Sequence, residues 1–95
     1  MKIAVIGSTM MDIVSYTDEM PQAGETRRVN GFHIASGGKG ANQAIAAAKL
    51  GADVVMMTAV GDDIFGEQSR RNFREHHIDM SLVKTAENTS NGIAT

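Results

Sequence analysis

The chain has 95 residues and a formal net charge of −2; 42% of its residues are hydrophobic and 21% are charged. This composition is typical of a globular protein and excludes disordered and fibrous classes. With four aromatic residues and its basic residues mixed with acidic ones, the chain is not expected to bind nucleic acid. It has no cysteine, and the apolar run before Gly7 is too short for a signal peptide or membrane span. We therefore expect a cytoplasmic protein without a membrane partner.

The first third of the chain predicts one buried strand and a separate small sheet. Residues 3–6 form a continuous apolar run ending at Gly7, which favours a strand buried on both faces. The pattern weakens over residues 13–21, and residues 21–24 are typical of a turn. Residues 26–34 mix polar and apolar side chains as a half-exposed strand does. We expect this part to lie outside the main core.

The remaining residues predict alternating helices and strands. Residues 41–50 favour a helix closed by Gly51, and residues 52–60 favour a second buried strand. Asp62 and Asp63 can cap a helix over residues 64–77. A third strand is predicted over residues 80–84, and another begins at Gly92. The order predicts right-handed βαβ units and a parallel sheet covered by helices. The alternation of strands and helices stops before the sheet is complete, as expected for the N-terminal piece of a longer protein.

Residues 35–44 combine three glycines and Lys39 immediately before the alanine-rich helix. Glycine lets the backbone approach a ligand closely, and the free amides at a helix start suit an oxygen-rich ligand. The segment is not a Walker A loop, because His33 and Gly40 stand where Gly and Ser or Thr are required. It is not a dinucleotide fingerprint either, because no third glycine follows in register.

The spacing of the glycines, Lys39 and Asn42 resembles the first motif of the ribokinase (PfkB) family of carbohydrate kinases. Within this family the resemblance is to ribokinases and deoxyribokinases. Further segments resemble that family in order along essentially the whole chain. The matching segments are Gly7-Ser8 with Asp12, Gly24-Glu25-Thr26, Gly38-Lys39-Gly40-Ala41-Asn42-Gln43-Ala44, Gly51, Gly61-Asp62-Asp63 with Gly66-Glu67, and Thr89-Ser90-Asn91-Gly92-Ile93-Ala94.

The resemblance implies an ATP-dependent sugar kinase with a Rossmann-like parallel sheet, helices on both of its faces and a small β-sheet lid. Residues 1–95 would then be the N-terminal part of a single domain, with lid strands within about 13–36 and again from about 90 to 95. It also implies a homodimer formed through the lid strands. ATP, Mg²⁺ and a monovalent cation such as K⁺ would bind mainly outside this segment.

The resemblance places Asp12, Gly38, Lys39 and Asn42 where family members hydrogen-bond sugar hydroxyls. Their chemistry agrees, since a carboxylate accepts, an ammonium donates, and an amide does both. Simpler roles remain open for each residue. Asp12 could be a cap at a strand end, Asn42 a helix-start residue without ligand, and Lys39 a surface residue.

Met10 departs from the family pattern, because ribokinases resemble one another in carrying an asparagine at this position. A thioether donates no hydrogen bond and accepts only weakly. The change favours a sugar with hydrogen in place of one hydroxyl, and 2-deoxy-D-ribose is the obvious candidate beside D-ribose. The alternatives are a Met10 that faces the core, or a water that bridges the missing contact.

The family's catalytic Asp-Thr-x-Gly-Ala-Gly-Asp stretch does not occur in these residues, so we assign no catalytic, nucleotide-binding or metal-binding residue here. The expected reaction is transfer of the ATP γ-phosphoryl group to the 5-hydroxyl of a pentose. Two alternatives stay open: a related kinase for a ketohexose, a keto-deoxy acid or a nucleoside, or a non-catalytic remnant that ends at Thr95. His76 and His77 are expected to be a solvated helix end.

Overall fold

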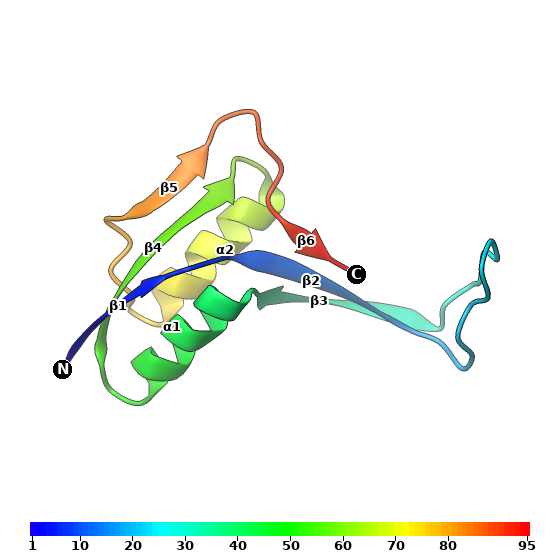
Figure 1. The fold of residues 1–95 in the computed structure, drawn as a ribbon, viewed down its shortest axis with the longest axis horizontal. Helices are drawn as coiled ribbons and strands as arrows, with labels where there is room; N and C mark the ends of the chain where they lie inside the picture. The colour runs from blue at the N-terminus through cyan, green and yellow to red at the C-terminus, as the bar shows by residue number, and fades with distance from the viewer.

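The computed structural model describes residues 1–95 and contains two three-stranded sheets and two helices (Figure 1). The main sheet is parallel, with strand order β1-β4-β5, and its strands are connected through the helices. Its elements are β1 (Lys2–Ile6), α1 (Lys39–Lys49), β4 (Asp53–Gly61), α2 (Ile64–Glu75) and β5 (Val83–Ala86). The fold is therefore the predicted α/β class with a parallel sheet. No helix is long and apolar enough to cross a membrane.

Both helices cover the same face of the main sheet. Val54 and Met56 lie on one side of β4 and belong to a buried cluster with Ala41 and Ala44 of α1 and Phe73 of α2. This follows from the strand order: two right-handed crossovers that advance in the same direction place their helices on the same side. The helices expected on the opposite face are not formed by residues 1–95.

The second face of the main sheet is open within these residues. Ile6 is 75% exposed and Met57 is 43% exposed, although both are large apolar side chains. The expectation that β1 is buried on both faces is therefore wrong for this segment, because the segment supplies no element to cover that side.

The helix ends follow the predicted chemistry. Gly51 has φ of 94°, and its amide and that of Ala52 donate to the carbonyls of Ala48 and Ala47. These two bonds form the glycine-terminated cap expected at the end of α1. The second helix is shorter than predicted and ends at Glu75. His77 has φ of 57°, and the Ile78 amide donates back to Phe73, so the chain leaves the helix there.

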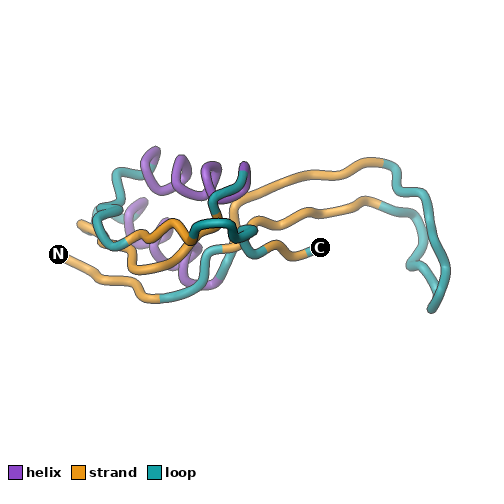
Figure 2. Tube along the Cα trace, turned by 90° about the horizontal axis from the view of Figure 1, so that it is seen from above, coloured by secondary structure: helices purple, strands orange, loops and turns teal.

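The second sheet, of strand order β3-β2-β6, projects from the helical part of the molecule (Figures 1 and 2). Its strands are β2 (Met10–Tyr16), β3 (Gly31–Gly37) and β6 (Ile93–Ala94). The pairing of β2 with β3 is antiparallel, and that of β2 with β6 is parallel. The molecule consequently measures 48 × 32 × 20 Å.

Three strand boundaries differ from the sequence prediction. The strand expected to start near residue 26 starts at Gly31, because the Asn30 amide donates to the Tyr16 carbonyl and closes the pairing there. The preceding β2 begins at Met10, whereas the lid strands were expected to begin at about residue 13. The strand predicted over residues 80–84 lies at residues 83–86 instead.

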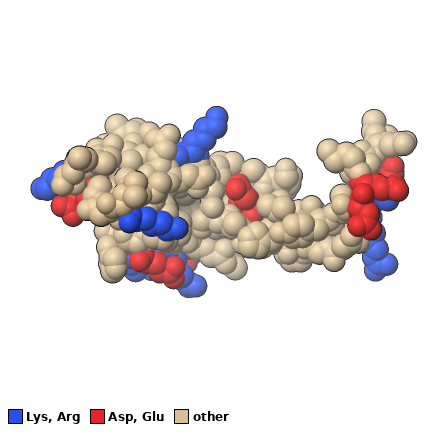
Figure 3. All heavy atoms as spheres, turned by 90° about the horizontal axis from the view of Figure 1, so that it is seen from below, with Lys and Arg blue, Asp and Glu red and all other residues tan.

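The tip of the second sheet carries charges of both signs (Figure 3). Arg27 lies 3.1 Å from Glu19 and 3.0 Å from Glu25, which ties together the loop between β2 and β3. Such exposed ion pairs contribute little stability, at most about 1 kcal/mol each. The shape of the tip therefore depends mainly on the β2–β3 pairing.

Two consecutive carboxylates hold the returning segment before β6. Asp63 accepts from the Gly66 amide at 2.9 Å as the cap of α2, and from the Asn91 amide at 3.0 Å. Asp62 accepts from the amides of Asn88 and Thr89 at 2.6 and 3.1 Å. These bonds place β6 beside β2.

The second sheet joins α1 through close backbone contacts. Gly38 has φ of 97°, and a Cβ there would lie 2.7 Å from the Ser8 carbonyl oxygen and 2.8 Å from the Met10 nitrogen. A Cβ on Gly40 would lie 2.7 Å from the Gly7 Cα. Side chains are therefore excluded where the loop after β1 crosses the start of α1.

We predict that the Asp63 carboxylate stabilises the fold above the acid range. Its pKa is lowered below 3.8, chiefly by the hydrogen bond from the Gly66 amide and next by that from Asn91. Because the folded-state pKa is lowered, this stabilisation is present above pH 3.8 and is lost as the pH falls through the folded-state value. In Asp63→Asn, unfolding monitored by circular dichroism between about pH 2 and 6 should show a lower stability at pH 6 and a shallower acid-side slope.

The matched control for this experiment is Glu87→Gln. The Glu87 side chain is exposed and makes no hydrogen bond within the chain. Asp79, whose pKa is also lowered, chiefly by the Ser81 amide, is retained in both variants. Equal acid-side slopes for the two variants would contradict the role given to Asp63.

We also predict that Gly38→Ala destabilises the protein by about 2 kcal/mol or more, because a positive φ and two backbone clashes act together. The control is Gly31→Ala, where a Cβ would meet no atom within 4 Å. The free energy of unfolding measured in urea should fall much further for Gly38→Ala. A similar small loss for both variants would refute the prediction.

Candidate functional site

Met10 and Asp12 lie on the same face of β2, since alternate residues of a strand point to the same side. In the neighbouring strands Asp12 is paired with Ala35 of β3 and Ala94 of β6. All these neighbours have small side chains. The two longer side chains are therefore flanked across the strands by small groups, while the next pair along this face, Val14 and His33, is larger.

The Asp12 carboxylate packs over the backbone of Gly37. A Cβ added to Gly37 would lie 2.7 Å from the Asp12 Cγ, so a side chain at this position would displace the carboxylate from where it lies. Asp12 is half-buried and makes no hydrogen bond or ion pair within the chain. Its two oxygens are therefore free to accept hydrogen bonds from a ligand.

The position of Asp12 corrects the sequence interpretation. The sequence left open that Asp12 caps a strand end, but β1 ends at Ile6 and Asp12 is the third residue of β2. After a short loop at Gly7–Thr9 the chain re-enters extended structure and pairs with β3. The carboxylate thus belongs to the projecting sheet.

Met10 is half-buried and rests against the returning segment. A Cβ on Gly92 would meet the Met10 thioether, lying 3.1 Å from its Cε. The next residue, Met11, points to the other face and is only 1% exposed. Of the two methionines, Met11 is therefore the core residue, and Met10 forms part of the Asp12 face.

Gly38 and Lys39 stand where β3 passes into α1. The Ala41 amide donates to the Ser8 carbonyl at 3.0 Å, and the Asn42 amide donates to the Gly38 carbonyl at 2.9 Å. The amides of Lys39 and Gly40 remain as donors at the positive end of the helix dipole. The Lys39 side chain is exposed and makes no ion pair. Its long chain is free to reach a bound ligand.

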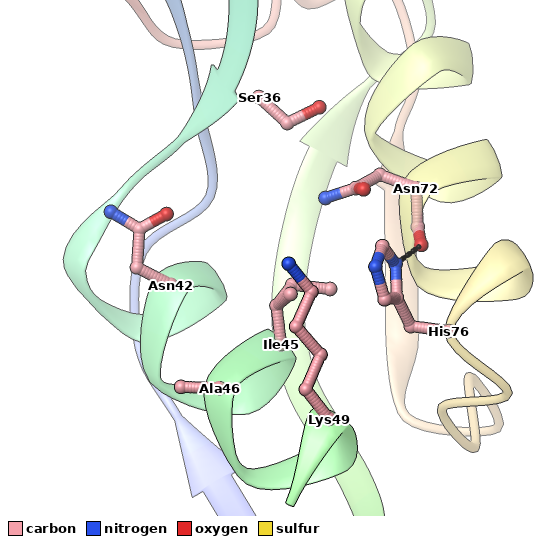
Figure 4. Close-up of a pocket in the computed structure, with 7 residues that line it drawn as sticks. All are labelled: Ser36, Asn42, Ile45, Ala46, Lys49, Asn72 and His76. Carbon is pink, nitrogen blue, oxygen red and sulfur yellow. Dashed lines mark hydrogen bonds between the residues drawn. The ribbon is translucent and has the colours of Figure 1, made fainter.

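The side chain of Asn42 lies apart from Met10 and Asp12. It lines a groove between α1 and α2 together with Ser36, whose side chain is on the face of β3 opposite to the Asp12 side (Figure 4). Figure 4 shows Asn42 at the margin of this groove. The structure therefore brings Met10, Asp12 and Gly38 together, with Lys39 adjacent and the Asn42 amide directed elsewhere.

Sequence reasoning missed several residues of these two regions. Gly37 and Gly92 form the surfaces against which Asp12 and Met10 pack, and only the strand register reveals this. His76 was expected at a solvated helix end, yet it is half-buried, and its Nδ1 donates to the Asn72 carbonyl at 2.8 Å. The spacing of four between Asn72 and His76 is the only sequence signal that could have found this bond.

Comparison with known proteins identifies the family. Residues 1–95 match the pfkB family of carbohydrate kinases. A deoxyribokinase of Salmonella typhi is 51% identical over 94 residues, and a ribokinase of Bacillus subtilis is 44% identical over 92 residues. These alignments cover 99% and 97% of this chain and 31% of each relative. The chain thus spans less than a third of the length of these relatives.

The fold agrees with this relationship. The structure of Arabidopsis thaliana ribokinase complexed with ribose and ATP superposes with a TM-score of 0.84 at 28% identity. The superposition covers 95% of this chain and 30% of that one. Together with the match over the whole chain, this confirms the family predicted from the glycine motif: the chain belongs to the pfkB family of carbohydrate kinases.

Proposed function

We propose that this chain forms part of the sugar site of an ATP-dependent kinase that phosphorylates the 5-hydroxyl of a pentose, 2-deoxy-D-ribose in preference to D-ribose. The observation that carries the proposal is the placement of Met10 beside Asp12 on one face of β2, next to the glycine turn at Gly38. The relatives named deoxyribokinase and ribokinase support a pentose as the substrate class.

The chemistry of the pair explains the preference. The Asp12 carboxylate can accept hydrogen bonds from two sugar hydroxyls, and it has no competing partner within the chain. Met10 presents an apolar thioether to the same space. A hydroxyl buried against it would lose a partner at a cost of about 1–3 kcal/mol, whereas a deoxy carbon would not.

Lys39 and Asn42 complete the site in this proposal. Lys39 is exposed and unpaired, so its ammonium can donate to a hydroxyl once a sugar is bound. The Asn42 side chain makes no hydrogen bond within the chain, so it can rotate from the margin of the α1–α2 groove toward the sugar. In this role residues 1–95 bind and orient the substrate.

The phosphoryl-transfer groups belong outside this segment. Residues 1–95 hold no group of three or more His, Cys, Asp or Glu side chains that could share a metal ion. We therefore assign to these residues neither Mg²⁺, K⁺, the ATP site nor the catalytic base. ATP would supply the phosphoryl group, with Mg²⁺ neutralising its charge.

We further propose a cytoplasmic homodimer that associates through the second sheet. Its edge strand β3 leaves backbone groups unpaired, and Phe32 and Ile34 on one face of it are 67% and 39% exposed. An exposed apolar edge strand favours pairing with another chain. The sequence predicted the half-exposed strand at residues 26–34, but the edge strand runs from Gly31 to Gly37. The proposed contact between the two copies therefore uses Gly31–Gly37.

We predict that Met10→Asn shifts the preference toward D-ribose in the full-length protein. The amide supplies the missing partner for a hydroxyl, so the ratio of kcat/KM for ribose over 2-deoxyribose should rise by roughly tenfold or more. The control is Met20→Asn, which makes the same change at a side chain that is 86% exposed. An unchanged ratio would refute the role of Met10. Turnover of a ketohexose, a keto-deoxy acid or a nucleoside in place of both pentoses would refute the substrate class.

We predict that Asp12→Ala lowers kcat/KM for both pentoses by about a hundredfold or more, since two hydrogen bonds to a charged acceptor are lost. The ratio between the two sugars should change little, because Asp12 reads the hydroxyls that they share. Asp53→Ala, at an exposed carboxylate of β4, is the control and should retain activity. Near-normal kcat/KM in Asp12→Ala would show that this carboxylate does not hold the sugar.

A further inference from the structure

The groove between α1 and α2 is a second polar hollow, distinct from the face that carries Met10 and Asp12. It has a volume of about 410 Å³, within the range of small-molecule sites. Its lining residues come from the end of β3, from one side of α1 and from the last turns of α2: Ser36, Asn42, Ile45, Ala46, Lys49, Asn72 and His76.

Polar side chains converge on this hollow. Figure 4 shows the Lys49 ammonium, the Asn72 amide and the His76 ring turned toward the same space, with the Ser36 hydroxyl above them. No lining residue is acidic. The ion pairs of the chain all involve Arg27 or Arg74, so Lys49 has no carboxylate partner.

The orientation of His76 is fixed by its own helix. The Asn72 carbonyl can only accept, so Nδ1 of His76 carries the hydrogen of the 2.8 Å bond. The other ring nitrogen, Nε2, makes no hydrogen bond within the chain; it accepts in the neutral ring and donates only when the ring is protonated. Ile45 and Ala46 supply an apolar wall beside these polar groups.

The positions of the two basic side chains have a simpler explanation that accounts for only part of the arrangement. Lys49 is in the last turn of α1 and His76 is the C-cap of α2, where helix dipoles favour cations. The helix dipoles, however, do not explain why a hollow lies open between the helices. They also do not explain why the side chains of Asn72 and Ser36 face this hollow. The convergence of four side chains from three elements points to a ligand.

We propose that this groove binds a small oxyanion, namely inorganic phosphate or the phosphate group of a phosphorylated metabolite. Lys49 supplies the positive charge, and the Asn72 amide and Ser36 hydroxyl donate to the anion oxygens. Nε2 of His76 donates when the ring is protonated. The volume accommodates a phosphate together with a small organic body. The groove shares only Asn42 with the proposed sugar site, and the anion binding proposed here uses other side chains and does not depend on the proposed reaction.

The test is calorimetric titration of the full-length protein with inorganic phosphate and, separately, with glycerol 3-phosphate. Lys49→Gln and Asn72→Ala should each weaken binding by about tenfold or more, because a charged or a neutral donor is removed from the anion. The matched control is Lys84→Gln, which removes the same charge from an exposed position on β5 and should leave affinity unchanged. Similar affinity for the two compounds would identify the phosphate group alone as the ligand, and tighter binding of the ester would identify a phosphorylated metabolite.

Three results would overturn the proposal. Absence of binding by both compounds at about 10 mM would leave no specific anion site. Equal weakening in Lys49→Gln and Lys84→Gln would show a general effect of net charge. Binding that is unaffected by both Lys49→Gln and Asn72→Ala would place the anion elsewhere. All three results are independent of sugar turnover and thus of the proposed kinase activity.

Discussion

The contact between Gly7 and Gly40 sets the geometry of the whole molecule. A side chain at either position would collide with the other backbone, so two glycines are needed for the loop after β1 to cross the start of α1. This crossing brings the Ser8 carbonyl to the Ala41 amide at 3.0 Å. Because β2 begins two residues after Ser8 and β3 ends just before Gly38, the same contact aligns the two strands that carry the candidate sugar site.

The third strand of the projecting sheet depends on a different set of interactions. A two-residue strand such as β6 has too few ladder bonds to hold its own place. Asp62 and Asp63 accept backbone amides from the segment before it, and the buried Asn91 side chain accepts from the Gly61 amide at 3.0 Å. One turn after β4 therefore caps α2 and also positions Gly92 against Met10. The end of the main sheet and the candidate sugar site are thus mechanically linked.

Much of the fold could be predicted because local chemistry determined it. Gly51 and Asp63 mark helix ends through backbone conformation and capping, which depend on neighbouring residues alone. The exposure of Ile6 and the start of β2 at Met10 depend on which segments pack or pair across the molecule, so apolar runs could not reveal them. The side of the sheet that the helices cover follows from strand order, which the sequence pattern leaves open.

The candidate site was only partly predictable for a related reason. Motif spacing singles out residues, but the face that each one occupies depends on strand register. Met10 and Met11 are adjacent and chemically identical, yet one lies on the Asp12 face and the other is buried beneath it. Likewise Ser36 faces the α1–α2 groove while Gly37 supports the Asp12 carboxylate. A single strand thus separates two polar regions that are continuous in sequence, and only the structure assigns each residue to its side.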